Sequence, residues 1–346
     1  MFGSLIGNER AKETLRRMLR QGRLPGALLL AGEEGLGKKL FAVEVARAFM
    51  CRAKEGVEGC GVCPACVRAA KFELPASDDK DEFRKVIWSG HRDVGQIRPY
   101  NRSILVDAVR DLERECNFRP VEGSARVFLI EHAEGLNESS SNALLKTLEE
   151  APPTTHLILI TSRPAALLPT IRSRCQTVRF APLTPEELEG YLVKTRKRSG
   201  EEARLAARLS GGRPAVALGI NLDTYRERRD AMLGVVEALA GGAADRSRLL
   251  RAAEELSDAK NKDEFEPRLD VLETLVRDLW LVALGGEGAP VVNDDLRGRL
   301  ARAARDVGPS RPPRWLARVE ELRSQLAVNV NRRVAADALF LGMAAD

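Results

Sequence analysis

A glycine-rich loop between an apolar run and a helical pattern constrains this fold more than any other feature. Residues 32–39 read Gly-Glu-Glu-Gly-Leu-Gly-Lys-Lys, after the apolar run Ala27–Ala31. This is the spacing of a phosphate-binding P-loop, in which glycines let backbone N–H groups close on phosphate oxygens and a lysine reaches the terminal phosphates. The predicted phosphate-binding residues are Gly32, Gly35, Gly37, Lys38 and Lys39.

The last position of the loop departs from this pattern. A P-loop ATPase places a Ser or Thr there, whose hydroxyl ligates Mg²⁺, whereas a charged Lys39 has no lone pair to offer. The sequence therefore predicts a nucleotide-binding fold with a degenerate phosphate loop. Binding of ATP or ADP stays open, because the glycines could still hold phosphate and Lys39 could instead fill the pocket itself.

A second apolar run, Arg126–Ile130, predicts a buried strand of a parallel sheet. P-loop enzymes place an Asp for Mg²⁺ at the end of such a strand, followed in many ATPases by a Glu that activates water. The corresponding residues here are Glu131 and His132, and imidazole is a poor substitute for a carboxylate base. Glu131 could still hold a metal, but the pair indicates an impaired hydrolytic site; if both are ordinary polar residues at a strand end, no hydrolysis is expected either.

Further alternation of helices and strands predicts an α/β domain. Residues 139–150 read as a helix and Leu157–Thr161 as another buried strand. Thr161 ends that strand, where it would either touch a γ-phosphate or simply cap a loop. We therefore expect a doubly wound α/β P-loop domain with a parallel sheet over residues 1–182.

Beyond residue 182 the pattern is helical. Thr184-Pro185 followed by two glutamates is a helix start, and residues 183–224 are expected to form a small helical lid domain. From 225 to 346 apolar residues recur at helical spacing, which predicts a C-terminal all-α bundle domain.

Four of the six cysteines gather in the segment 51–66, namely Cys51, Cys60, Cys63 and Cys66. Their Cys-x2-Cys spacings let thiolates converge on one Zn²⁺ through a tight turn. Four protein thiolates leave no open coordination position, so structural zinc is predicted rather than catalytic zinc. The alternative is four reduced thiols that merely lie close together. The charged segment 71–88 that follows reads as a solvated surface insertion without an assigned function.

The composition permits acidic partners without requiring them. The chain has 55 basic and 50 acidic residues, a formal net charge of +5. No apolar run approaches the ~18 residues of a membrane span, and the first residues lack a secretory pattern. A cytoplasmic location is the expectation.

Together these motifs resemble the clamp-loader AAA+ subunits of bacterial DNA polymerase III. The resemblance covers residues 1 to about 220 strongly; it is carried by the P-loop, the four cysteines, Ile6-Gly7-Asn8, the Ala143–Glu150 helix and Ser173-Arg174-Cys175. The gamma/tau ATPases of this family keep a Thr after the P-loop lysine and an Asp-Glu pair at the second strand. Lys39 and Glu131-His132 instead resemble the delta-prime branch, as does His91-Arg92-Asp93, which is similar to a His-Pro-Asp after the zinc module.

The resemblance implies catalysis by donation. In this family the Ser-Arg-Cys motif presents an arginine finger to ATP on a neighbouring subunit, a role that passes to Arg174, with Ser173 and Cys175 positioning it. A guanidinium offers fixed donors to the charge that develops on a transferring phosphoryl group. Outside this context the same residue would read as a surface arginine in an ion pair. Thr161 and Arg213 take the places of sensor residues.

The implied partners are gamma/tau and delta subunits in a hetero-oligomeric ring, with the sliding clamp and primed DNA reached through the assembly. The first hypothesis is a non-hydrolysing component of the DNA polymerase III holoenzyme that completes one ATP site. A second is a gamma/tau-like ATPase motor that uses Glu131 and a displaced base. A third is a zinc-dependent DNA-binding module with a relic P-loop, against which the modest charge and the lack of basic clusters interleaved with aromatics count.

Overall fold

The computed structural model describes residues 1–22, 24–53, 56–73, 75, 79–196, 198–241, 246–257, 263–326 and 331–346. The chain forms two compact units, one of Met1–Arg198 with Ser210–Leu218 and one of Ser199–Leu209 with Gly219–Asp346. Each unit has a hydrophobic core of its own.

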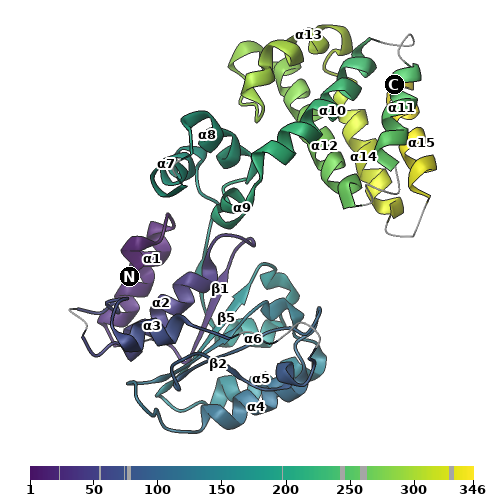
Figure 1. Ribbon diagram of the computed structural model, residues 1–346. Coiled ribbons are helices and arrows are strands. Elements are labelled where there is room, and N and C mark those ends of the chain that lie inside the picture. The colour runs from purple at the N-terminus through teal and green to yellow at the C-terminus, as the bar shows by residue number, and fades with distance from the viewer. Residues whose placement is uncertain are drawn as a thin grey trace. The chain divides into compact units, whose positions relative to one another are not determined.

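A six-stranded sheet in the order β2-β3-β4-β5-β1-β6 forms the centre of the first unit (Figure 1). All neighbouring strands are parallel except the edge strand β2, which is antiparallel to β3. The strands are β1 (Ala27–Ala31), β2 (Ile87–Trp88), β3 (Val94–Ile97), β4 (Arg126–Ile130), β5 (Thr155–Thr161) and β6 (Gln176–Arg179). The parallel α/β sheet predicted from the apolar runs is confirmed.

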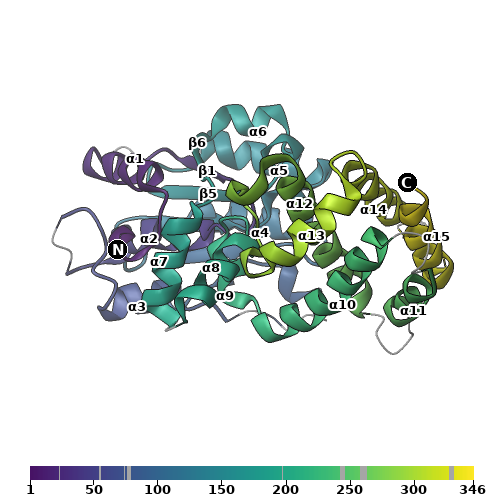
Figure 2. The ribbon, with the colours of Figure 1, turned by 90° about the horizontal axis from the view of Figure 1, so that it is seen from above.

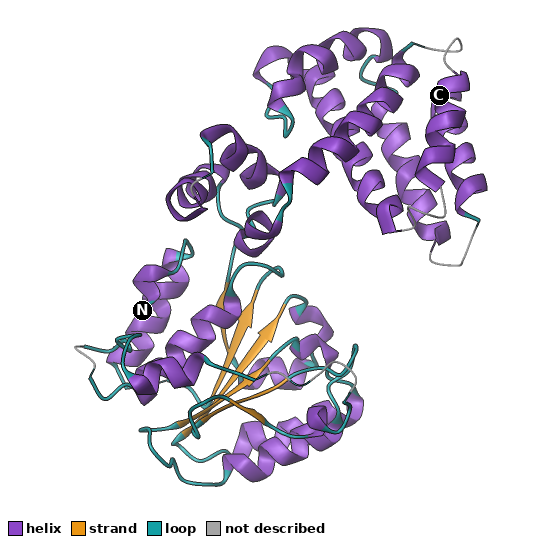
Figure 3. Cartoon of the chain, in the orientation of Figure 1, coloured by secondary structure: helices purple, strands orange, loops and turns teal. Residues whose placement is uncertain are grey.

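Helices cover both faces of this sheet (Figures 1 and 3). On one face lie α1 (Glu9–Arg20), α2 (Lys38–Met50) and α3 (Pro64–Ala70); on the other lie α4 (Val106–Cys116), α5 (Glu138–Glu150) and α6 (Pro169–Arg174). Because successive strand residues point to opposite faces, Leu28 and Leu30 of β1 pack into the first layer and Leu29 into the second.

The segment 71–88 was expected to be a solvated surface insertion, and this is wrong for its second half. Phe83, Val86 and Ile87 are buried, and the segment ends in the edge strand β2. Apolar residues scattered among charges gave no regular period, so the burial was not visible in the sequence. Residues 74 and 76–78 of this segment lie outside the described residues.

Two further helices belong to the first unit: α7 (Pro185–Arg196) and α9 (Pro214–Gly219), the latter except for its last residue. The predicted start of α7 is present, since Thr184 Oγ1 accepts the Glu187 N–H at 3.2 Å and Glu187 Oε2 accepts the Thr184 N–H at 3.0 Å. These reciprocal bonds form a capping box, which satisfies two backbone donors at the start of the helix. Short 3-10 turns occur at Phe2–Ser4, Glu82–Arg84, Ala133–Gly135 and Pro164–Ala166.

All regular secondary structure among the described residues of the second unit is helical (Figures 2 and 3). Its helices are α8 (Gly200–Leu209), α10 (Leu222–Ala240), α11 (Arg246–Ser257), α12 (Phe265–Gly285), α13 (Arg297–Val307), α14 (Pro312–Leu326) and α15 (Arg332–Ala345), with 3-10 turns at Gly286–Gly288 and Asp294–Leu296. The fully buried Trp315 donates its indole N–H to Met343 O at 2.8 Å, which ties α14 to α15. Within the described residues, no helix is long and apolar enough to span a membrane.

Candidate functional site

The predicted P-loop connects β1 to α2 at the carboxyl edge of the sheet. Gly35 and Gly37 have φ of +85° and +81°, a left-handed conformation that residues with a Cβ rarely adopt. A Cβ at Gly32 would lie 2.5 Å from Phe180 O. The loop therefore has the tight backbone path that a phosphate-binding loop needs, and the glycines at the predicted positions account for it.

Lys38, the lysine expected to reach terminal phosphates, is turned onto the loop itself. Its Nζ donates to Gly32 O at 2.6 Å and to Glu33 O at 2.5 Å. The side chain is buried, and burial lowers its pKa, with the carboxylates of Glu134, Glu34 and Glu33 opposing the shift.

Lys39 and Glu131 form an ion pair inside this site. Lys39 Nζ lies 2.5 Å from Glu131 Oε1, and the Phe72 ring lies 5.3 Å from the same ammonium. Glu131 follows β4, so the pair joins the substituted P-loop position to the substituted metal-binding position. An ammonium thus occupies the side of the loop where an ATPase holds Mg²⁺ between a hydroxyl and a carboxylate.

The other strand-end residues are engaged with each other. His132 adopts a left-handed conformation at φ +46° and is half exposed, with its Nδ1 3.8 Å from Glu134 Oε1. Glu134, which sequence reasoning missed, is partly buried, with its side chain 8% exposed. Burial raises its pKa, but the hydrogen bond from Ser162 Oγ at 2.7 Å and further donors outweigh this effect and leave the pKa low. Thr161 Oγ1 accepts the Arg163 N–H at 3.0 Å, in the loop that follows β5.

Helix α9 closes on the loop. The Ala215 N–H donates to Gly35 O at 3.0 Å, and Arg213 Nε donates to Ser210 O at 2.8 Å beside it. The cavity bounded by the P-loop, the tips of β4 and β5 and Ala215 measures about 240 Å³. This is below the ~300–1,000 Å³ of typical small-molecule pockets. The predicted nucleotide residues are therefore brought together, but around a small space.

Arg174 lies at the surface, at the last position of α6. Its Nη2 is 2.5 Å from Glu149 Oε1 of α5, and its Nη1 donates to Thr170 O at 3.0 Å. Ser173 Oγ donates to the same carbonyl at 3.0 Å, while Cys175 points into the core and its pKa is raised to about 11 by burial. The motif thus buries its cysteine and exposes its arginine.

The four predicted metal ligands converge. The sulfur atoms of Cys51, Cys60, Cys63 and Cys66 all lie within 4.8 Å of one another, and Cys51 Sγ is 3.9 Å from Cys63 Sγ. Tetrahedral ligands at a zinc–sulfur distance of ~2.3 Å lie about 3.8 Å apart, so the group fits one ion. N–H donors from Cys63 and Val62 lower the pKa of Cys60 to about 6, whereas burial raises that of Cys66 to about 12. The cluster could hold a metal, as the spacing predicted.

His91-Arg92-Asp93 has a structural environment. The buried Asp93 carboxylate accepts the N–H groups of Val121, Glu122 and Gly123, each at 2.7 Å. His91 Nδ1 accepts the Asp93 N–H at 3.2 Å. The aspartate therefore fixes the loop that leads into β4.

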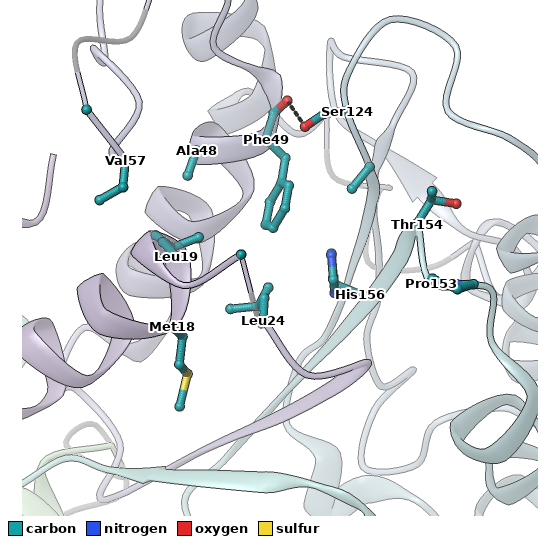
Figure 4. Close-up of a pocket in the computed structure, with 13 residues that line it drawn as sticks. Met18, Leu19, Leu24, Ala48, Phe49, Val57, Ser124, Pro153, Thr154 and His156 are labelled. Atoms are coloured by element: carbon teal, nitrogen blue, oxygen red, sulfur yellow. Dashed lines mark hydrogen bonds between the residues drawn. The ribbon is translucent and has the colours of Figure 1, made fainter.

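A larger cavity of about 390 Å³ lies at the opposite, amino edge of the sheet (Figure 4). Phe49 and His156 face each other inside it, with ring centroids 4.7 Å apart. Since a carbonyl can only accept, His156 Nδ1 donates to Pro25 O at 3.2 Å, and burial lowers the pKa of this histidine. Among the described lining residues His156 is the titratable one, so the cavity lacks the converging charges of the P-loop edge.

The chain is similar in sequence to subunits of bacterial DNA polymerase III. A family model described as "DNA polymerase III, delta subunit" matches residues 7–184. DNA polymerase III subunit delta' of Bacillus subtilis is 30% identical over 324 residues, covering 93% of this chain and 92% of the relative. The Escherichia coli subunit delta' is 31% identical over 324 residues, covering 92% and 89%.

A gamma/tau subunit is also similar. DNA polymerase III subunit gamma/tau of Mycobacterium bovis is 28% identical over 378 residues, covering all of this chain but 62% of that protein. The delta' relatives match at higher identity and over nearly their whole length, in line with the substitutions at Lys39 and His132. The chain therefore belongs to the delta-prime family of DNA polymerase III clamp-loader subunits.

Proposed function

We propose that this chain takes part in loading the sliding clamp onto primed DNA without hydrolysing ATP in its own site, and that Arg174 serves as an arginine finger for ATP on a neighbouring subunit. One contrast carries the proposal. At the chain's own P-loop, Lys39 stands where an ATPase has a metal-binding hydroxyl, and it pairs with Glu131 at 2.5 Å. The Ser-Arg-Cys motif, in contrast, keeps its arginine at the surface, with the Arg174 side chain 37% exposed. The chain has thus lost its own metal-binding and water-activating groups and keeps an arginine that a partner can reach.

The proposed partners are gamma/tau and delta subunits in a hetero-oligomeric ring. Their presence is suggested by the delta' and gamma/tau relatives, whose names place them in one polymerase. The clamp and primed DNA are reached through this assembly, in the cytoplasm. The division into an α/β domain (1–182), a lid (183–224) and an oligomerisation domain (225–346) belongs to the same proposal, as do Ser173, Thr161 and Arg213 as positioning and sensor residues.

Reconstitution with gamma/tau, delta, clamp and primed DNA tests the finger. Arg174→Ala should slow cleavage at the one site it serves by ~10³-fold, because a guanidinium supplied in trans contributes on that order to phosphoryl transfer. The readout is the amplitude of the single-turnover burst. Arg172→Ala, an exposed arginine on the same helix, is the matched control. Equal bursts for wild type and Arg174→Ala would refute the finger.

The purified chain separates this proposal from an ATPase motor. We expect no ATP turnover by the chain alone, since Lys39 and His132 replace the groups that hold metal and activate water. Turnover that Lys38→Ala abolishes would instead favour the motor hypothesis.

We propose zinc as the ion of the four-cysteine cluster. Bound zinc would cross-link the segment 51–66, and thiolates are the ligands that zinc prefers in structural sites. Metal analysis should find about one zinc per chain. A zinc-free preparation in which the helix Pro64–Ala70 stays folded would contradict this assignment.

A further inference from the structure

The arginine that the proposed function assigns to a neighbour's ATP is paired within its own chain. Arg174 Nη2 lies 2.5 Å from Glu149 Oε1, and Nη1 donates to Thr170 O at 3.0 Å. A guanidinium has five N–H donors; the bond to Thr170 O uses one, and the Glu149 carboxylate lies against Nη2, so donors on Nε and Nη1 remain for a partner. The ion pair therefore orients the guanidinium and still leaves it N–H donors for a partner.

Glu149 and Arg174 both lie on helices that are packed into the core. Helix α5 begins with a capping box in which Asn137 Oδ1 accepts the Ser140 N–H at 3.0 Å and Ser140 Oγ accepts the Asn137 N–H at 2.9 Å. Leu144 of α5 and Ile171 of α6 are both fully buried in the same core. Glu149 therefore presents its carboxylate from a helix that packs against α6. Without Glu149, the bond to Thr170 O would be the one polar contact, among the described residues, that restricts the rotamers of Arg174.

We infer that Glu149 is a positioning residue for Arg174: it holds the guanidinium at the surface with its free N–H groups available to a phosphate on the neighbouring subunit. The inference rests on the proposed role of Arg174. The two side chains are 37% and 49% exposed, and an exposed ion pair of this kind shifts an equilibrium only about two- to fivefold. If the carboxylate instead held Arg174 away from the neighbouring phosphate, removing Glu149 would raise the rate of ATP cleavage.

The test uses the reconstituted complex with clamp and primed DNA, with kcat and KM for ATP measured for each variant. Glu149→Ala should lower kcat at the served site about two- to fivefold and leave KM unchanged, because ordering of the guanidinium matters in the transition state. Glu149→Gln keeps the oxygen acceptor and should fall between. Glu150→Ala is the matched control, since Glu150 is exposed and forms no ion pair among the described residues.

A double-mutant cycle isolates the route through Arg174. In an Arg174→Ala background, Glu149→Ala should have no further effect. An unchanged or raised kcat in Glu149→Ala, or an equal loss in both backgrounds, would overturn the inference. If Glu149→Ala impairs assembly, the near-isosteric Glu149→Gln supplies the same comparison. If Arg174→Ala leaves kcat unchanged, the arginine finger itself is refuted. If Arg174→Ala lowers kcat but Glu149→Ala does not, only the positioning role of Glu149 is refuted.

Discussion

Lys39 and Glu131 bring opposite charges to within 2.5 Å on the side of the loop where a P-loop ATPase keeps its magnesium ion. An ammonium carries one charge and only donates, so it cannot gather oxygen ligands as Mg²⁺ does. The sequence showed that Lys39 could fill the pocket, but its pairing with Glu131 and the Phe72 ring depends on side-chain placement across 92 positions, which no local pattern contains.

Lys39→Thr should make nucleotide binding dependent on magnesium. The change removes the ion pair, restores a hydroxyl ligand and frees Glu131 for a metal, so Mg²⁺ should tighten ADP binding roughly tenfold. Isothermal titration with and without Mg²⁺ measures this. Lys39→Met frees Glu131 but adds no hydroxyl ligand, so it should show a smaller magnesium effect than Lys39→Thr. A wild-type chain that binds Mg-ADP as tightly as Lys39→Thr would contradict the prediction.

Asp93→Asn should loosen the loop before β4. Asp93 Oδ2 accepts two N–H groups and Oδ1 a third, so an amide NH₂ in either orientation faces a donor. Hydrogen bonds to a charged acceptor contribute ~1.5–3 kcal/mol, so the opening free energy should fall by about 2–3 kcal/mol. Hydrogen exchange of amides 121–123 reports it. Arg92→Ala, at the exposed neighbour, should leave these amides protected, and unchanged protection in Asp93→Asn would show that the carboxylate is dispensable.

The elements differed in how far their sequence revealed them. β1, β4 and β5 were predictable because buried parallel strands read as continuous apolar runs. β3 was not, since Gly95 and Gln96 interrupt four residues, and the two-residue β2 exists only through its pairing with β3. The same holds for the site. The P-loop and the strand ends were predicted from local spacing. The contacts of Glu134 with Ser162 and of Glu149 with Arg174 were not, because they join separate elements.

Metal removal should unfold α3 while the sheet persists. Cys63 precedes α3 and Cys66 lies within it, and Arg47 of α2 donates to Cys66 O at 3.0 Å. A seven-residue helix is marginal without tertiary support, so chelation should release about one zinc and expose amides 64–70 to hydrogen exchange. Cys60→Ser should reproduce this, whereas Cys116→Ala, outside the cluster, should retain the metal. Protected α3 amides in a zinc-free chain would count against a structural metal.

The residues of the proposed site all lie in one of the two units. The P-loop, the cysteine cluster and Arg174 all belong to the first unit, whereas the described residues of 225–346 are helical and form one core. The helical pattern of this region was readable from the sequence. Which helix faces stay uncovered was not, because burial depends on how the six helices α10 to α15 pack together.

Assembly should depend on two exposed apolar side chains of α15. Val334 and Leu341 are 62% and 38% exposed and stand seven residues apart, hence on the same side of the helix. If residues 225–346 join the ring, burying these side chains against a partner would contribute to affinity, and placing carboxylates there would desolvate unpaired charge. Val334→Glu with Leu341→Glu should therefore weaken co-assembly with gamma/tau and delta by roughly tenfold or more, seen by native mass spectrometry.

The matched control for this face is Leu284→Glu, an exposed leucine at the end of α12 in the same unit. Thermal unfolding of the double variant should match wild type, because neither side chain belongs to the buried core. If the double variant assembles as well as Leu284→Glu does, the contact between subunits lies elsewhere on the chain. A loss confined to the α15 variant would assign this helix to the ring interface, and Arg174-dependent ATPase should then decline in proportion to the complex lost.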